Sequence, residues 1–328
     1  MPEFKNAIYE TPGCIICEMD EPDLIYSGQG ECGFPVNICI CKHCGFVYLN
    51  PRWNEETYFS FYQYAYDKYW RKNPSVLPPE KDVSSYYLLY QRLLNTFADF
   101  KPHNVLDIGS GNGRHLSYIM QQYPNAEYHA IESSASYKPE IEKRGIEFIV
   151  NDVNTDWDKS FEKKFDFVIM RHVLEHFLEP EKVLAKVQKT MTDDGILYIA
   201  VPDAMRNFIL HNNFTVVHPY FFSDVSISNL LIKCGFEVKK MINAEYSGHT
   251  EMYLFAGKQQ NNLKNGALNI SSENYTKQKE VFLLKLKKEK RFLQPNSFWK
   301  LVKMIVRVKK FFFPQPILRT FKQNDAKI

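Results

Sequence analysis

The sequence feature that most constrains the fold is a glycine-rich stretch, NVLDIGSGNGRH, at residues 104–115. Its first five residues predict a buried strand, and Gly109, Gly111 and Gly113 predict a tight turn leading into a helix. The spacing is G-x-G-x-G, which differs from the G-x-G-x-x-G of dinucleotide sites. Asp107, at the end of the strand, would repel a pyrophosphate and attract a cationic amino group. The turn therefore favours a ligand that carries an amino group; a turn whose glycines serve only the backbone is the alternative.

Beyond this stretch the chain alternates between expected strands and helices, which predicts a doubly wound α/β sheet. A helix is expected at 180–190, and another at 223–234 before Gly235. Two late strands follow that second helix, and they fit a sheet closed by an antiparallel hairpin. The expected strands are 104–108, 126–131, 146–150, 165–170, 196–201, 236–241 and 251–256.

Acidic side chains follow two of these strands. Glu132 comes 25 residues after Asp107, at the end of the second strand, where a carboxylate can accept both hydroxyls of a ribose. Asp152 follows the third strand and could accept a hydrogen bond from an adenine amine. The two acids together favour a nucleoside ligand at this edge of the sheet.

Six of the seven cysteines lie between residues 14 and 44. Cys14 with Cys17, and Cys41 with Cys44, form two C-x₂-C pairs, the spacing of a tetrahedral four-thiolate zinc site. Four thiolates leave no open position, so the zinc would hold the fold and take no part in catalysis. A reduced, metal-free small domain is the alternative. The residues that could replace one of these ligands are Cys32, Cys39 and His43.

An aromatic run, YFSFYQYAYDKYW, follows at residues 58–70. It could pack the small domain onto the large one, or its tyrosines could line an acceptor pocket. A linker with three prolines is expected at 73–82, and a helix at 83–97. The tyrosines considered for the acceptor pocket are Tyr62, Tyr64, Tyr66 and Tyr69.

The order VLDIGSGNG, IESS, NDV, DFVIMRHVLEHFLEP and GILYIAVP resembles the class I S-adenosylmethionine-dependent methyltransferases. The earlier pattern C-x₂-C…C-x₂-CGFVYLNPRW, followed by tyrosines, is similar to the zinc-knuckle-fronted methyltransferases of bacterial sugar and surface-polysaccharide biosynthesis. The resemblance implies a Rossmann-like α/β sheet of seven strands at 73–258. It further implies a zinc module at 1–72 before that domain. A polar linker, residues 259–277, and a basic amphipathic helical tail are expected at 259–328.

The resemblance also implies roles for individual residues. Asp107 would hold the methionine amino group and Glu132 the ribose hydroxyls, in agreement with the argument from charge. The other cofactor-binding residues that it implies are Gly109, Ser110 and Gly111 beneath the ligand, with Asn112 and Gly113, Asp152 and Val153 beside the adenine, and Arg171 and His172 below the sulfonium.

Methyl transfer to a hydroxyl requires alignment and the removal of a proton, and histidine suits the role of base near neutral pH. His176, expected one helical turn from His172, and His218 are the candidate catalytic residues, and a structural role is the alternative for each. In related sugar C-methyltransferases a tyrosine and an acid precede the matching histidine, whereas this chain has Thr215 and Val217. The difference favours O- or N-methylation over C-methylation.

The basic residues are concentrated near the end of the sequence. Residues 285–322 carry twelve Lys and Arg against one acid, although the whole chain has a net charge of only +3. Residues 298–310 predict a helix with an aromatic–aliphatic face and a lysine-rich face, a pattern typical of in-plane membrane binding. Packing of the apolar face on the body or on a second subunit is the alternative.

These observations predict an S-adenosylmethionine-dependent O-methyltransferase with zinc as a structural metal and a sugar, nucleotide sugar or surface glycan as acceptor. A lipid-like acceptor such as a quinone precursor, or a non-catalytic scaffold, are the alternatives. No signal peptide and no apolar stretch of about 20 residues is seen, so we expect a cytoplasmic protein, peripheral on the inner face of the membrane through its tail. No nucleic-acid partner is expected.

Overall fold

The computed structural model of the chain describes residues 6–65, 100–159, 161–206, 214–246, 249–259 and 268–293. Three predicted segments lie outside the described residues: the linker 73–82, the helix 83–97 and the amphipathic helix 298–310. Tyr66 and Tyr69 of the aromatic run also lie outside them, as does the side chain of His249.

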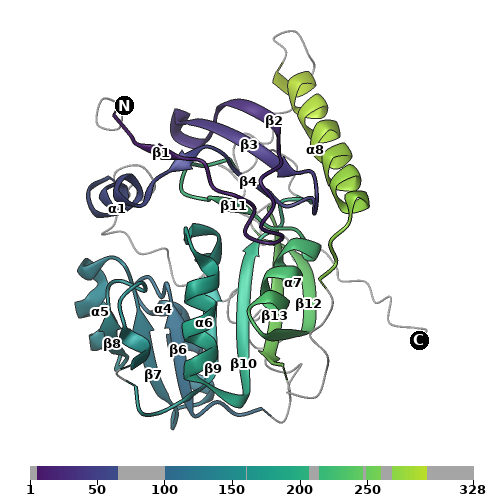
Figure 1. The fold of residues 1–328 in the computed structure, drawn as a ribbon. Helices are drawn as coiled ribbons and strands as arrows, with labels where there is room; N and C mark the ends of the chain where they lie inside the picture. The colour runs from purple at the N-terminus through teal and green to yellow at the C-terminus, as the bar shows by residue number, and fades with distance from the viewer. Residues whose placement is uncertain are drawn as a thin grey trace. The chain divides into compact units, whose positions relative to one another are not determined.

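The centre of the structure is a seven-stranded sheet with the order β12-β13-β10-β9-β6-β7-β8 (Figure 1). Strands β8, β7, β6, β9 and β10 run parallel, and β13 and β12 close the sheet as an antiparallel hairpin, as predicted. The strands are β6 (Asn104–Ile108), β7 (Glu127–Ile131), β8 (Glu147–Val150), β9 (Phe165–Arg171), β10 (Met191–Pro202), β12 (Phe236–Tyr246) and β13 (His249–Lys258). The chain leaves β6 on one side towards β7 and later returns on the other side through β9. The carboxyl end of β6 is therefore the switch point where such sheets bind ligands.

Helices cover both faces of this sheet because side chains alternate along its strands. Leu106 and Ile108 of β6 belong to the core that includes helices α6 and α7, whereas Val105 belongs to the core that includes α4 and α5. The helices are α4 (Arg114–Gln122), α5 (Lys138–Lys143), α6 (Pro180–Thr190) and α7 (Asp224–Lys233). The doubly wound architecture is confirmed, with α6 ending where the sequence predicted.

Strand β10 differs from the prediction. The sequence predicts a strand at 196–201, but the strand already begins at Met191 and continues to Pro202. Its pairing with β9 changes register between Met191 and Ile196. Asp193, Asp194 and Gly195, which precede the predicted strand, therefore form an irregularity within one longer strand.

The amino-terminal module is a second, smaller sheet with the order β11-β4-β3-β2. Its outermost strand, β11 (Tyr220–Phe221), comes from the later part of the chain and pairs antiparallel with β4. Phe46 and Tyr48 of the module share one hydrophobic core with residues of the large sheet. The module is therefore joined to the large sheet by backbone pairing and by common packing. Its elements are β1 (Tyr9–Glu10), β2 (Pro22–Gln29), β3 (Pro35–Cys41), β4 (Val47–Leu49), β5 (Arg52–Trp53) and α1 (Glu55–Tyr64).

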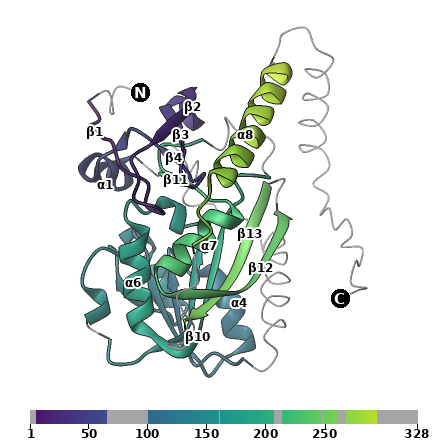
Figure 2. The ribbon, with the colours of Figure 1, turned by 45° about the vertical axis from the view of Figure 1, so that its right-hand side comes forward.

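Helix α8 (Ser272–Leu293) begins earlier than the sequence indicated (Figure 2). Residues 259–277 are predicted to be a polar linker, but Ser272 already starts the helix. Tyr275 and Lys279 both contact the Asp23 carboxylate, and Phe282 stacks on Phe214, so the first part of the helix is amphipathic. By its internal contacts the chain divides into two compact units, Met1–Phe282 and Leu283–Ile328. Among the described helices, none combines the length and the apolar character that crossing a membrane requires.

Candidate functional site

The glycine turn at the carboxyl end of β6 has the backbone that its sequence predicts. Gly109 and Gly113 have φ values of +77° and +74°, a region in which a side chain is strained. A Cβ on Gly109 would lie 2.7 Å from a methyl group of Val173, so this position has no room for one. The Gly109 amide donates to Ile131 O of β7 at 2.8 Å, which ties the turn to the neighbouring strand. The turn therefore offers a backbone surface that a ligand can approach closely.

Glu132, directly after β7, faces this turn. One of its carboxylate oxygens accepts the Gly111 amide at 2.7 Å, and the other accepts the Ser134 amide at 2.9 Å and the Ser133 hydroxyl at 3.3 Å. The oxygen that faces Gly111 keeps a lone pair for another donor. A ribose hydroxyl could also replace the long hydrogen bond from Ser133. Glu132 is thus positioned by the turn and retains acceptor capacity for a diol.

Asp107 is buried in β6 at 3% exposure. Burial, together with the negative charge of Glu132, raises the pKa of Asp107 to about 7, against a smaller opposing effect of Arg171. A cationic ligand group beside it would replace the missing solvation and favour the ionised form. The two carboxylates Asp107 and Glu132 therefore create a negative field at the glycine turn, which suits an ammonium group and disfavours a phosphate.

The remaining predicted cofactor residues lie along the same edge of the sheet. Asp152 is half-buried after β8 and accepts the Asn154 amide at 2.8 Å. His172 follows β9 with a left-handed backbone, φ +50°, and its amide donates to Ala200 O. Ser110 is buried; the others are half-buried: Asn112, Val153 and Arg171.

A second group of residues meets near the end of β9; we call Tyr62, Glu175, His176 and His218 the histidine centre. The Tyr62 hydroxyl lies 2.6 Å from His176 Nδ1, and His176 Nε2 lies 3.2 Å from His218 Nε2. The two imidazole rings are nearly perpendicular, at 86°. The structure therefore brings together both predicted catalytic histidines and one of the predicted pocket tyrosines.

Both histidines of this centre are uncharged at neutral pH. Burial lowers the pKa of His218 to about 3, with His176 adding to the effect, and burial likewise lowers the pKa of His176. Each ring therefore offers one N–H and one lone pair. A consistent arrangement has His218 Nε2–H donating to His176 Nε2, and His176 Nδ1–H donating to Tyr62.

The predicted relation between His172 and His176 is wrong. The sequence places them one helical turn apart, but only Leu174–His176 form a short 3₁₀ turn, and the left-handed backbone of His172 precedes it. His172 instead lies between two acids, with its Nε2 3.1 Å from Glu251 and its Nδ1 3.5 Å from Glu175. Burial alone would lower the pKa of His172, but these carboxylates raise it above the ordinary value. His172 therefore offsets one of the two negative charges of this buried acidic pair.

Glu175 and Glu251 are site residues that the sequence analysis missed. Glu175 reads as a helix-surface acid in the sequence, yet it is only 2% exposed, and Glu251 is 5% exposed on β13. The Glu251 carboxylate also accepts the Tyr253 hydroxyl at 2.7 Å. The one local signal for the burial of Glu175 is that it lies between apolar Leu174 and Phe177, since an acid on the surface does not require apolar neighbours.

The amino-terminal module holds the histidine centre through several buried contacts. The Tyr58 hydroxyl of α1 lies 2.6 Å from both His176 O and Val217 O, which joins the backbones that carry the two histidines. Arg52 donates to Leu178 O and to the Tyr220 hydroxyl. Helix α1 therefore supplies both a side chain of the centre and part of its support.

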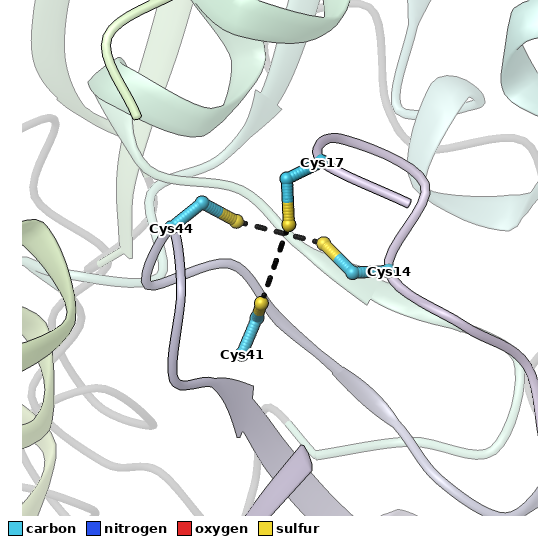
Figure 3. Close-up of side chains that lie close together, drawn as sticks. All are labelled: Cys14, Cys17, Cys41 and Cys44. Atoms are coloured by element: carbon cyan, nitrogen blue, oxygen red, sulfur yellow. Dashed lines mark hydrogen bonds between the residues drawn. The ribbon is translucent and has the colours of Figure 1, made fainter. Parts of the chain in front are cut away.

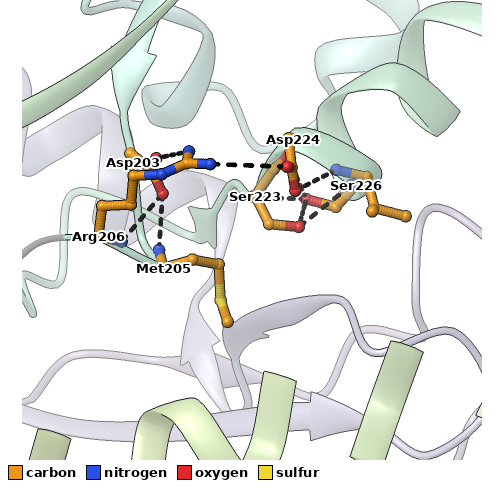
Figure 4. A network of polar contacts seen from close by, with 7 residues as sticks. Asp203, Met205, Arg206, Ser223, Asp224 and Ser226 are labelled. Carbon is orange, nitrogen blue, oxygen red and sulfur yellow. Dashed lines mark hydrogen bonds and ion pairs between the residues drawn. The ribbon is translucent and has the colours of Figure 1, made fainter. Parts of the chain in front are cut away.

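The segment that carries His218 is fixed at both of its ends. Asp203, fully buried after β10, accepts the Met205 and Arg206 amides and pairs with the Arg206 guanidinium (Figure 4). The same guanidinium lies 4.0 Å from Asp224 at the start of α7. Ser223 caps that helix through the Ser226 amide. Arg206 thus links the segment that leaves β10 with the helix that follows His218.

The four cysteines of the two predicted pairs converge, and we call Cys14, Cys17, Cys41 and Cys44 the cysteine cluster (Figure 3). The Cys14 and Cys44 sulfurs are 3.5 Å apart, as are those of Cys17 and Cys41. In a tetrahedron with Zn–S bonds of about 2.3 Å the sulfurs are roughly 3.8 Å apart, so the cluster fits that ion closely. Of the alternative ligands, Cys32 and His43 are exposed, and the Cys39 thiol donates to Asn50 O.

One other predicted pocket tyrosine does not join either site. Tyr64 is 80% exposed on α1, so it does not line the histidine centre. Thr215 and Val217, which replace the tyrosine and acid of sugar C-methyltransferases, are buried close to His218 in sequence. The Thr215 carbonyl accepts the His218 amide at 3.3 Å.

Comparison with known proteins agrees with this geometry. A family described as a methyltransferase domain matches residues 83–240. (S)-coclaurine N-methyltransferase of Thalictrum flavum subsp. glaucum is 28% identical over 136 residues, which are 39% of this chain and 36% of that protein. C-methyltransferase NovU of Streptomyces niveus is 22% identical over 225 residues, 67% of this chain and 50% of that protein. The chain thus spans between about a third and a half of the length of these curated relatives.

Among solved structures, the 1,6-didemethyltoxoflavin-N1-methyltransferase of Burkholderia thailandensis, determined with S-adenosylhomocysteine, shares the fold. The match has a TM-score of 0.50 at 17% identity and covers 73% of this chain and 100% of that one. The parallel sheet with its antiparallel hairpin, the glycine turn with its two acids, and the matched family lead to one conclusion. Residues 83–240, a little under half of the chain, resemble the class I S-adenosylmethionine-dependent methyltransferases.

Proposed function

We propose that this protein transfers a methyl group from S-adenosylmethionine to a hydroxyl of a sugar-type acceptor, free, nucleotide-linked or in a surface glycan. The observation that carries the proposal is the placement of two uncharged, hydrogen-bonded histidines beside the cofactor edge of a methyltransferase sheet. The N- and C-methyltransferases among the relatives leave the acceptor atom open, so the hydroxyl is our inference from the chemistry of the histidine centre.

The donor would be held by the edge of the sheet. Asp107 would bind the amino group of the methionine portion, and Glu132 the ribose hydroxyls. Gly109 and Gly111 would let the ligand lie against the backbone, and Arg171 would balance the two carboxylates. When bound, S-adenosylmethionine supplies an electrophilic methyl group on a sulfonium. The protein has to align an oxygen with that methyl group and accept one proton.

His218 would accept this proton. Its Nε2–H is engaged with His176, so the free lone pair is on Nδ1. A pKa of about 3 makes His218 a weak base in the ligand-free protein, but the attacked oxygen becomes strongly acidic as the C–O bond forms. Because Glu175 is buried and ionised nearby, it would stabilise the imidazolium that results. His176 and Tyr62 would orient His218 through their hydrogen bonds.

The cysteine cluster would hold a structural zinc ion. Its four sulfurs fit a closed tetrahedral site, and burial leaves no position for a substrate. Hydrogen bonds from Cys14 and Cys44 lower the pKa of the Cys41 thiol, so at least one thiolate is favoured before metal binds. The zinc would stabilise the module that carries Tyr62.

Two measurements test the proposal. Calorimetry should detect S-adenosylmethionine binding that Asp107→Asn abolishes and the exposed control Asp193→Asn retains. If Asp107→Asn binds the cofactor as tightly as the wild type, the cofactor site is wrong. Mass spectrometry of reactions with candidate nucleotide sugars should then find a product heavier by one methyl group. Methylation restricted to lipid-like acceptors, or binding without any product, would favour the alternative acceptor or the scaffold.

A further inference from the structure

The histidine centre contains a second set of metal-ligating groups that is distinct from the cysteine cluster. A carboxylate oxygen of Glu175 and one ring nitrogen each of His176 and His218 all lie within 4.8 Å of one another. Two imidazoles and one carboxylate form a donor set that binds divalent first-row transition metals in proteins. The 3.2 Å between the two Nε2 atoms matches the roughly 3.0–3.4 Å between ligands that each lie about 2.1 Å from one ion.

The Glu175 carboxylate points to a missing ligand. Its side chain is 3% exposed, and neither oxygen accepts a hydrogen bond from any residue that the structure describes. The nearest charged partner is His172 Nδ1, 3.5 Å from Oε1. A buried carboxylate in this position is costly unless a cation or hydrogen-bond donors satisfy it. A cation shared with the two histidines would do so.

The surroundings prepare both histidines for coordination through Nε2. Tyr62 engages His176 at Nδ1 with a 2.6 Å hydrogen bond, so Nε2 is the nitrogen that faces His218 and can coordinate a cation. Such a contact on the distal nitrogen is the usual support of a metal-bound histidine. Both rings are half-buried, so an ion from solvent can reach them.

We infer that Glu175, His176 and His218 form a site for a divalent transition-metal cation, and that its occupancy switches methyl transfer off. The inhibitory part rests on the proposed function. For a cation to bind Nε2 of His218, that nitrogen must first give up the proton that it donates to His176, and the neutral ring then carries its proton on Nδ1. Nδ1 is the nitrogen that would take the proton from the hydroxyl group of the methyl acceptor. A metal-bound His218 therefore has no lone pair left for catalysis.

Binding is tested without any activity, by titrating Co²⁺ into protein whose cysteine cluster already holds zinc. The wild type should bind one further Co²⁺ per chain, with an absorption spectrum that lacks the charge-transfer bands of thiolate ligands. Glu175→Gln and His218→Asn should each weaken this binding at least tenfold, and the exposed control Glu179→Gln should leave it unchanged. A saturation value of one metal ion per chain, zinc included, would overturn the site. So would Co²⁺ binding by Glu175→Gln and His218→Asn that is as tight as that of the wild type.

The effect on catalysis is tested on the wild type alone. Added Co²⁺ should lower the methyl-transfer rate with the same half-saturation concentration as binding, and a chelator should restore it. Stimulation by Co²⁺, or binding without a change in rate, would overturn the inhibitory role and the assignment of His218 as base, while the metal site would stand. If no acceptor is ever methylated, the binding experiment still decides the site.

Discussion

The cysteine cluster and the histidine centre both gather side chains that can bind a cation, but the chain assembles them differently. The cluster comes from two short turns within residues 14–44, and each turn supplies a ready pair of sulfurs. The histidine centre combines α1, the turn after β9 and the segment before β11, and Tyr62 and His176 lie 114 positions apart in the sequence. One site follows from local spacing, and the other exists only after the module has docked.

The two sites also differ in what they can do. Three of the four cysteines are buried, and their four sulfurs would complete the tetrahedral shell of the proposed zinc ion, so the role that we propose for the cluster is to support the fold. The histidine centre has nitrogen and oxygen donors, half-exposed rings and a lone pair that can accept a proton. The cysteine cluster, with its supporting role, is thus separate from the histidine centre, where we place the chemistry. Helix α1 and the pairing of β4 with β11 connect the two.

The largest expected effect is the loss of the cluster's metal. Cys41→Ser should remove the zinc and lower the free energy of unfolding by several kcal/mol, because metal binding at such a site is coupled to folding. Metal analysis and thermal unfolding measure this, with the exposed Cys32→Ser as the matched control. If Cys41→Ser keeps the metal content and melting temperature of the wild type, the cluster has no structural metal.

The next effect separates chemistry from binding. His218→Asn should lower kcat by about 10²- to 10⁴-fold, the usual contribution of a general base, and leave the affinity for S-adenosylmethionine unchanged. His103→Asn, at an exposed histidine near β6, serves as the control. A variant that loses cofactor affinity but keeps its kcat would place His218 with the cofactor instead of the acceptor.

The position of Asp107 and Glu132 at one edge of the sheet could be predicted from the sequence because its information is local. Each acid stands at the end of a strand of recognisable pattern, and parallel strands bring their carboxyl ends to one edge. The cysteine pairs are equally local. The doubly wound sheet follows from the alternation of strands and helices, and the closing hairpin follows from the two late strands.

The histidine centre could be predicted only in part, because its decisive contacts are tertiary. His176 and His218 were candidates by residue type, but nothing in the sequence pairs them with each other or with Tyr62. Glu175 reads as a surface acid in the sequence, although the folded chain leaves it only 2% exposed. Strand β11 was missed because two residues carry no periodic signal, although its pairing with β4 joins the two sheets.

A smaller effect is a pH dependence of the affinity for S-adenosylmethionine. It concerns Asp107, which belongs neither to the cysteine cluster nor to the histidine centre. The pKa of Asp107 is raised to about 7, so the carboxyl becomes neutral as the pH falls through that value and loses its attraction for an ammonium group. The affinity for S-adenosylmethionine should fall about 20- to 30-fold between pH 7.5 and 5.5. Calorimetry at both pH values measures it. A pH-independent wild-type affinity would show that Asp107 is already ionised before the cofactor arrives.

The smallest expected effect, from Tyr62→Phe, asks most directly whether the module takes part in the chemistry. The variant keeps the aromatic ring and removes only the hydroxyl at 2.6 Å from His176, so the melting temperature should change little. Without this hydrogen bond His176 can rotate or change tautomer, and kcat should fall about tenfold, or about 1.4 kcal/mol, at unchanged cofactor affinity. Tyr64→Phe, two residues along α1 and exposed, is the matched control. If both variants retain full activity, the module only supports the histidine centre. It would then act through the hydrogen bonds of Tyr58 to the backbone and not through a side chain that contacts His176.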